Sequence, residues 1–138
     1  MKLSLCDMSS VKDYHIEILV RRCSRISVLN LRKTSIKNDS VASIIQNLKN
    51  TLEELNVNDN DIEFDKLLEV RSLPKLKILN CLYLYDFEEI DRLRRQLPNL
   101  TINRKTVSAA APDLLFEPKD GFWNIEATQS KLFQNNIP

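Results

Sequence analysis

The feature that most constrains this chain is a short apolar spacing that recurs along it. In the segment TLEELNV, residues 51–57, Leu52, Leu55 and Val57 stand at intervals of three and then two. A helix face needs intervals of three and four, and a half-buried strand needs alternation throughout. The spacing therefore predicts a short strand with Leu55 and Val57 pointing into the core, while Leu52 turns in from the approach to that strand.

The same spacing occurs in further segments of the chain. Its middle position falls at residues 3, 29, 55, 79 and 100, so the steps are 26, 26, 24 and 21 residues. Steps of roughly 20–29 residues are typical of leucine-rich repeats. The segments are MKLSLC, which carries a partial copy, RISVLNL, TLEELNV, KLKILNC and LPNLTIN.

Apolar stripes of helical period lie between these copies, within residues 16–23, 41–48, 64–73 and 87–97. Each stripe is typical of a helix that buries one face. Parallel strands that are joined through helices follow a right-handed crossover. The sequence therefore predicts an α/β fold, a right-handed leucine-rich-repeat solenoid or horseshoe with a parallel concave sheet and convex helices.

The repeat pattern ends at Asn103. We expect residues 1–103 to form a solenoid of about four to five repeats and residues 104–138 to form an irregular C-terminal tail. The tail holds three of the five phenylalanines and the only tryptophan, Trp123. This composition is too aromatic for a disordered segment, so we expect the tail to pack back on the solenoid.

The alternation along each strand assigns every second side chain to the concave face. Asn30, Asn56 and Asn80 fall in one register and should form a column across neighbouring strands. Two interpretations of this column stay open: a ladder of amides that only maintains the surface, or direct contact with a protein partner. The candidate protein-binding residues on this face are Val28, Asn30, Arg32, Glu54, Asn56, Asn58, Ile78, Asn80 and Leu82.

The composition argues against several classes of function. A formal net charge of +1 gives no steering toward nucleic acid or an acidic membrane. No apolar run reaches the roughly 18–20 residues of a membrane span. The three cysteines have scattered spacings that form no metal-ligand pair and favour a reducing, intracellular setting. We therefore expect a cytoplasmic or nuclear protein.

Catalytic motifs are also lacking, so we expect neither an enzyme nor a bound cofactor or metal. The sequence contains no glycine-rich phosphate loop, paired-carboxylate motif or nucleophile motif. His15, the sole histidine, is expected at the surface or at a helix end. Cys23 and Cys81 are expected in the core. Cys6 is expected on the concave side, where nothing nearby in the sequence would activate its thiol.

A family resemblance is carried by the segments ILVRRCSRISVLNL, IKNDS, LRRQLPNLTIN and GFWNIEATQSKLF. From about Tyr14 to about Phe133 the chain resembles the C-terminal repeats and tail of the S-phase kinase-associated F-box family. These proteins are leucine-rich-repeat substrate receptors of SCF-type ubiquitin ligases. In that family the tail returns along the concave face and helps to hold a small cyclin-dependent-kinase-binding protein and the phosphorylated substrate. The resemblance therefore implies that Trp123 is a tail anchor and a protein-binding residue.

The function that this resemblance implies is protein binding, as the substrate-recognition part of an SCF-type F-box ubiquitin ligase receptor without its F-box. The implied partners are a protein substrate or peptide segment on the concave face and a small cyclin-dependent-kinase-binding protein. No F-box helices precede the repeats, so direct binding of the ligase adaptor is not expected. The alternative is a stand-alone leucine-rich-repeat scaffold or assembly factor that is unrelated to ubiquitination.

Overall fold

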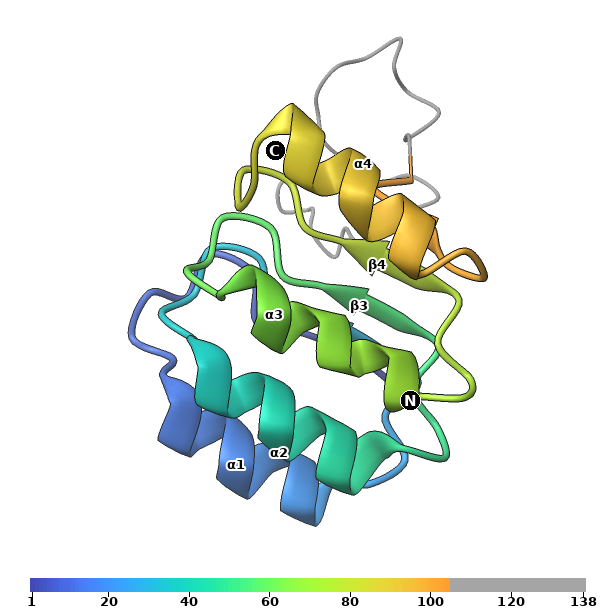
Figure 1. Ribbon diagram of the computed structural model, residues 1–138. Helices are drawn as coiled ribbons and strands as arrows, with labels where there is room; N and C mark the ends of the chain where they lie inside the picture. Colours follow the sequence, from blue (N-terminus) through green and yellow to red (C-terminus); the bar gives the residue numbers. More distant parts are fainter. Residues whose placement is uncertain (105–138) are drawn as a thin grey trace, which may run out of the picture. The chain divides into compact units, whose positions relative to one another are not determined.

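The computed structural model describes residues 1–104, which form two layers (Figure 1). One layer is a five-stranded parallel sheet in the order β1-β2-β3-β4-β5, and the helices cover one face of it. The elements in chain order are β1 (Lys2–Ser4), α1 (Asp13–Arg22), β2 (Val28–Asn30), α2 (Asn38–Leu48), β3 (Glu54–Asn56), α3 (Phe64–Leu67), the 3-10 helix η1 (Leu68–Ser72), β4 (Ile78–Asn80), α4 (Phe87–Gln96) and β5 (Thr101–Ile102).

The chain divides into the units Met1–Asn103 and Arg104–Pro138, and the sheet and helices belong to the first. The predicted return of the tail onto the solenoid, with Trp123 as its anchor, lies outside the described residues. None of the helices in residues 1–104 has the length and apolar character that crossing a bilayer requires.

The predicted leucine-rich-repeat solenoid, a horseshoe with a concave sheet and convex helices, is wrong. The described residues form a small α/β domain with five parallel strands and four α-helices. Its successive strand–helix units are not equivalent: α1, α2 and α4 have 10, 11 and 10 residues, whereas α3 has four and continues as η1. A recurrent strand spacing therefore produces a parallel sheet without uniform repeats around it.

The three central strands, β2, β3 and β4, form because each buries a leucine at its centre. Leu29 lies opposite Leu3 and Leu55 in the parallel register, and Leu55 lies opposite Leu79. The side chains of Leu29, Leu55 and Leu79 are 0–1% exposed. Full burial of one leucine stabilises a fold by about 1.5–3 kcal/mol. The predicted inward positions Leu52 and Val57 are likewise buried, so the interpretation of the TLEELNV spacing is confirmed.

A residue with positive φ follows each of the first four strands, three positions past the strand end. These residues are Asp7, Lys33, Asp59 and Tyr83, with φ between 54° and 70°. The left-handed conformation turns the chain away from the sheet, and aspartate tolerates it better than most residues. Backbone pairing continues through these turns, as in the Lys33 N–H that donates to the Asn58 carbonyl at 2.8 Å. The loops after the strands are therefore held in alignment with one another.

The helices contribute unequally to the core. In α1, Ile16 and Val20 are fully buried, whereas α4 buries only Leu93 among its own residues. The start of α4 is fixed by a capping box: the Asp86 carboxylate accepts the Glu89 N–H at 2.8 Å, and the Glu89 carboxylate accepts the Asp86 N–H at 3.2 Å. The first turn of α4 is therefore rigidly placed although most of the helix surface faces water.

Candidate protein-binding face of the sheet

The face of the sheet opposite the helices carries the side chains that the sequence singled out. We call it the outward sheet face, and it comprises Val28, Asn30, Glu54, Asn56, Ile78 and Asn80. The register places Val28, Glu54 and Ile78 in one row across β2, β3 and β4. Asn30, Asn56 and Asn80 form the adjacent row. The predicted asparagine column is thus present in the register of the sheet.

The side-chain oxygens of two of these asparagines bind the backbone at the end of their own strand. The Asn30 Oδ1 accepts the Arg32 N–H at 3.0 Å, and the Asn56 Oδ1 accepts the Asn58 N–H at 2.9 Å. Such bonds support a turn in the backbone after the strand. Because both oxygens have this structural role, contact with a partner through these residues would use the Nδ2 donors.

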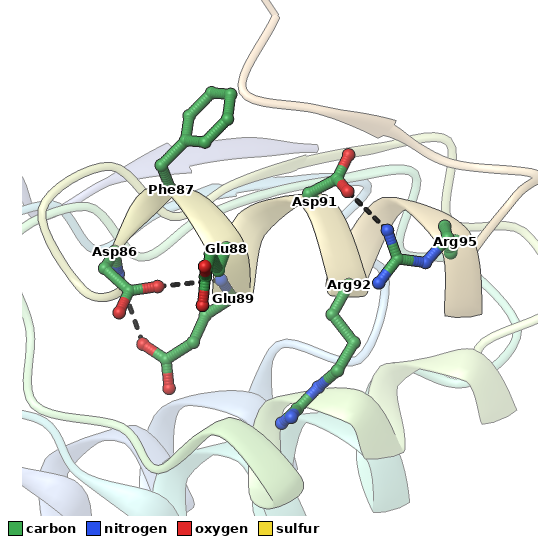
Figure 2. A pocket seen from close by; sticks show the side chains of 7 residues that line it. All are labelled: Asp86, Phe87, Glu88, Glu89, Asp91, Arg92 and Arg95. Carbon is green, nitrogen blue, oxygen red and sulfur yellow. Dashed lines mark hydrogen bonds and ion pairs between the residues drawn. The ribbon is translucent and has the colours of Figure 1, made fainter.

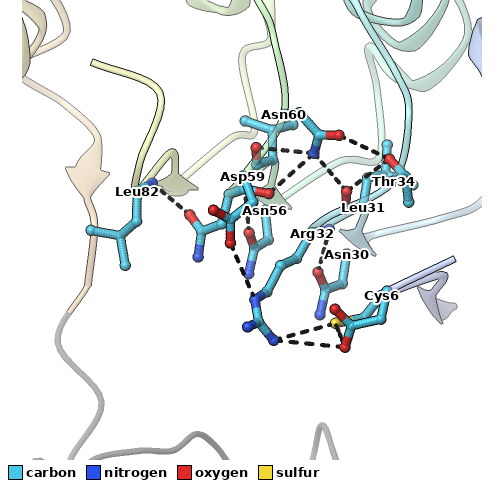
Figure 3. A network of polar contacts seen from close by, with 12 residues as sticks. Cys6, Asn30, Leu31, Arg32, Thr34, Asn56, Asp59, Asn60 and Leu82 are labelled. Atoms are coloured by element: carbon cyan, nitrogen blue, oxygen red, sulfur yellow. Dashed lines mark hydrogen bonds and ion pairs between the residues drawn. The ribbon is translucent and has the colours of Figure 1, made fainter. Parts of the chain in front are cut away.

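Asn58 also has a structural role that its predicted position on the binding face did not suggest. Its Oδ1 accepts the Leu82 N–H at 2.6 Å, which joins the loop after β3 to the loop after β4 (Figure 3). The side chain is only 9% exposed. Asn58 therefore binds neighbouring backbone, and its buried amide has little surface to offer a partner.

Asn60 is the central polar residue of the loops, and the sequence analysis missed it. Its Nδ2 donates to the carbonyls of Leu31, Val57 and Asn58 at 2.7, 3.1 and 3.2 Å (Figure 3). The Thr34 hydroxyl donates to the Leu31 carbonyl at 3.0 Å and lies 3.1 Å from the Asn60 Oδ1. Asn60 could have been recognised in the sequence from its place in NDND, residues 58–61, a run of turn-forming residues directly after a predicted strand.

Arg32 lies between two carboxylates from different loops. Its Nε is 3.9 Å from the Asp59 Oδ2, and its Nη1 is 3.9 Å from the Asp7 Oδ2. The Nη1 also donates to the Cys6 Sγ at 3.7 Å (Figure 3). The side chain of Arg32 is 39% exposed. Arg32 therefore links the loops after β1 and β3 through their carboxylates.

The Cys6 thiol in this cluster is not an activated nucleophile. Burial raises its pKa to about 12, Arg32 lowers the pKa and Asp7 raises it. The thiol therefore stays protonated at neutral pH. His15 lies at the start of α1, where its Nδ1 accepts the Lys12 N–H at 3.0 Å.

Alkylation of Cys6 in the folded protein is expected to accelerate about tenfold for each unit of pH between roughly pH 7 and pH 10. The reason is that the thiolate fraction grows tenfold per unit while the pH stays below the pKa. The rate is measured by mass spectrometry of the Cys6 peptide after treatment with iodoacetamide. A rate that levels off at about pH 9 would indicate a thiol with an ordinary pKa and contradict this expectation.

The remaining predicted residues differ in accessibility. Val28 and Asn30 lie on the outward sheet face but are both only 5% exposed. Half-buried positions on the outward sheet face are Glu54, Asn56, Ile78 and Asn80. Leu82, in the loop after β4, is 44% exposed. The accessible part of the candidate site is therefore its β3–β4 half, together with Arg32 and Leu82.

A separate hollow of about 450 Å³ runs along α4 (Figure 2). Every residue that lines it belongs to α4 or caps its start, so it is a surface groove. The lining residues are Asp86, Phe87, Glu88, Glu89, Asp91, Arg92 and Arg95. Within residues 1–104 there is no cluster of histidine, cysteine, aspartate and glutamate side chains that could hold a metal ion.

Comparison with known proteins bears on the fold. No family model matches the chain, and no curated protein matches it. A solved structure, leiomodin-1 actin-binding site 2, is similar with a TM-score of 0.59 and 11% sequence identity. The match covers 99% of this chain and 87% of that chain. This likeness supports a small α/β domain in place of the predicted solenoid, and at this identity it concerns the fold alone.

Proposed function

We propose that this domain is a protein-binding module that takes its partner on the β3–β4 half of the outward sheet face. The observation that carries the proposal is the composition of that surface. Glu54, Asn56, Ile78 and Asn80 are half-buried neighbours in two adjacent strands. An apolar side chain beside amide donors and a charge is the mixture typical of protein interfaces.

The geometry suits an extended segment of the partner. The segment would lie across β3 and β4, with the Asn56 Nδ2 donating to one of its backbone carbonyls. Ile78 and Leu82 would contact its apolar side chains, and Glu54 would select for a basic residue. Interface energy is concentrated in a few central residues, so binding should depend mainly on Asn56 and Ile78.

Two more specific roles agree with this proposal. One is substrate recognition for an SCF-type ubiquitin ligase, with a protein substrate or a small cyclin-dependent-kinase-binding protein as partner. The other is a stand-alone scaffold or assembly factor. The similar solved structure is an actin-binding site of leiomodin-1, which supports protein recognition as a use of this fold. Co-purification of ligase subunits with the bound partner would favour the first role, and their absence from a purified complex would favour the second.

The double substitution Asn56→Arg with Ile78→Asp is expected to abolish capture of the partner and to leave the domain folded, although loss of the Asn56 bond to the Asn58 N–H should lower its stability by about 1 kcal/mol. Both side chains lie on the outward sheet face. The long arginine at position 56 would block close approach of the partner, and the aspartate at position 78 would place an unpaired charge in the interface. Capture is measured by quantitative pull-down with the purified full chain, and folding by circular dichroism.

The matched control is Lys49→Glu with Glu69→Lys, a charge exchange at two exposed positions on the helix side. This variant should capture the same partners as the unaltered chain. Retention of the partner by the sheet-face variant together with its loss from the helix-side variant would assign binding to the opposite face and refute the proposal.

A further inference from the structure

A second surface with a different chemistry lies where the chain enters α4. Phe87, the first residue of α4, is 84% exposed, and Tyr83 in the preceding loop is 80% exposed. Large aromatic side chains in water are unfavourable, so a cluster of them is typical of interaction sites. We call Tyr83, Phe87 and the acidic residues of segment 82–91 the α4 entry patch.

The other aromatic residues nearby have interior roles, which sets Phe87 apart. The Tyr85 hydroxyl donates to the Ile62 carbonyl at 2.7 Å, and the ring packs edge-on against Phe64 with centroids 5.5 Å apart. The Arg92 guanidinium lies over the Phe64 ring, 4.1 Å from its centre. Phe87 instead points away from the helix into solvent (Figure 2).

The charge around Phe87 selects the kind of partner. The segment 82–91, LYLYDFEEID, holds four carboxylates and no lysine or arginine. All four of these carboxylate side chains line the groove along α4 together with Phe87. The same lining holds two arginines, of which Arg95 pairs with Asp91 and Arg92 lies over Phe64, so the groove has an excess of two negative charges. The groove therefore repels nucleic acid and anionic lipid, and it attracts cations.

We propose that the α4 entry patch binds an arginine-containing segment of a partner protein. An arginine would place its guanidinium on the exposed Phe87 ring, in the arrangement that Arg92 and Phe64 already adopt in this domain. Its N–H groups would reach the carboxylate of Asp91, which lies one helical turn beyond Phe87 on the same side of α4 (Figure 2). The capping box at Asp86 holds the first turn of α4 in place, so little ordering is needed on binding.

The test uses the full chain and a fluorescein-labelled peptide that carries arginines around a single leucine. Anisotropy titration should show binding that weakens as salt is raised from about 50 to about 300 mM, because the contact is largely electrostatic. Phe87→Ser should weaken binding about tenfold, and Glu88→Lys should also weaken it. A peptide with glutamate in place of arginine should not bind.

The matched control is Tyr14→Ser, which removes another exposed aromatic side chain from a helix, 60% exposed on α1. Its affinity for the peptide should equal that of the unaltered chain. Because Phe87 is exposed, Phe87→Ser should melt at the same temperature as the unaltered chain, and circular dichroism verifies this. Equal binding by Phe87→Ser and the unaltered chain, or equal binding of the arginine and glutamate peptides, would overturn the proposal.

Discussion

Replacement of Leu29 by alanine is expected to lower the free energy of unfolding by about 3–5 kcal/mol. Leu29 is fully buried at the centre of β2, and its register partners Leu3 and Leu55 lie on either side of it. The substitution removes apolar contacts and leaves a cavity that neighbouring strands cannot close without breaking the sheet register. Urea denaturation followed by circular dichroism measures the loss.

Leu3→Ala is the matched comparison for this prediction. Leu3 occupies the same register position in β1 but is only partly buried, because β1 is an edge strand of the described sheet. Water can fill part of the space that the side chain leaves, so the expected loss is below about 2 kcal/mol. Equal losses of unfolding free energy for the two variants would show that Leu3 is as well covered as Leu29. That result would contradict the place of β1 at the edge of the sheet.

The strands could be predicted from the sequence because their register depends on a local pattern. A slip of one residue in a strand would turn its buried leucine to the opposite face. The spacing around Leu29, Leu55 and Leu79 therefore determined both the strand positions and the row of asparagines on the opposite face of the sheet. The same pattern did not determine the fold class, since it does not show that α3 stops after four residues and continues as η1.

Several polar contacts of the candidate site were less predictable because they join residues far apart in the sequence. Arg32 lies between Asp7 and Asp59, which are contributed by the loops after β1 and β3. Asn58 bonds the Leu82 N–H, 24 residues further along the chain. Such partners follow from the alignment of loops beyond the strand ends. The column of asparagines was visible in the sequence, but the use of its oxygens by the backbone required the structure.

The substitution Asn60→Asp is expected to destabilise the domain by about 2–4 kcal/mol at neutral pH. It preserves the shape of the side chain but replaces the Nδ2 donor by an oxygen. That oxygen would face the carbonyls of Leu31, Val57 and Asn58, which the amide binds in the present structure. The contacts that the two amide hydrogens make with these carbonyls are lost, and a negative charge is placed against three partial negative charges. Thermal and urea unfolding at several pH values measure the effect.

The pH dependence of this variant separates lost hydrogen bonds from charge repulsion. The three carbonyls raise the pKa of the introduced carboxyl above its value in the unfolded chain, because they disfavour its anion. The folded state then binds the proton more tightly, so the variant gains stability relative to the unaltered chain as the pH falls through the raised pKa. Protonated aspartate can also donate to one carbonyl. The matched control is Asn50→Asp at an exposed position, which should lose almost no stability at any pH. If the stability lost by Asn60→Asp does not change with pH, the introduced carboxylate does not face these carbonyls.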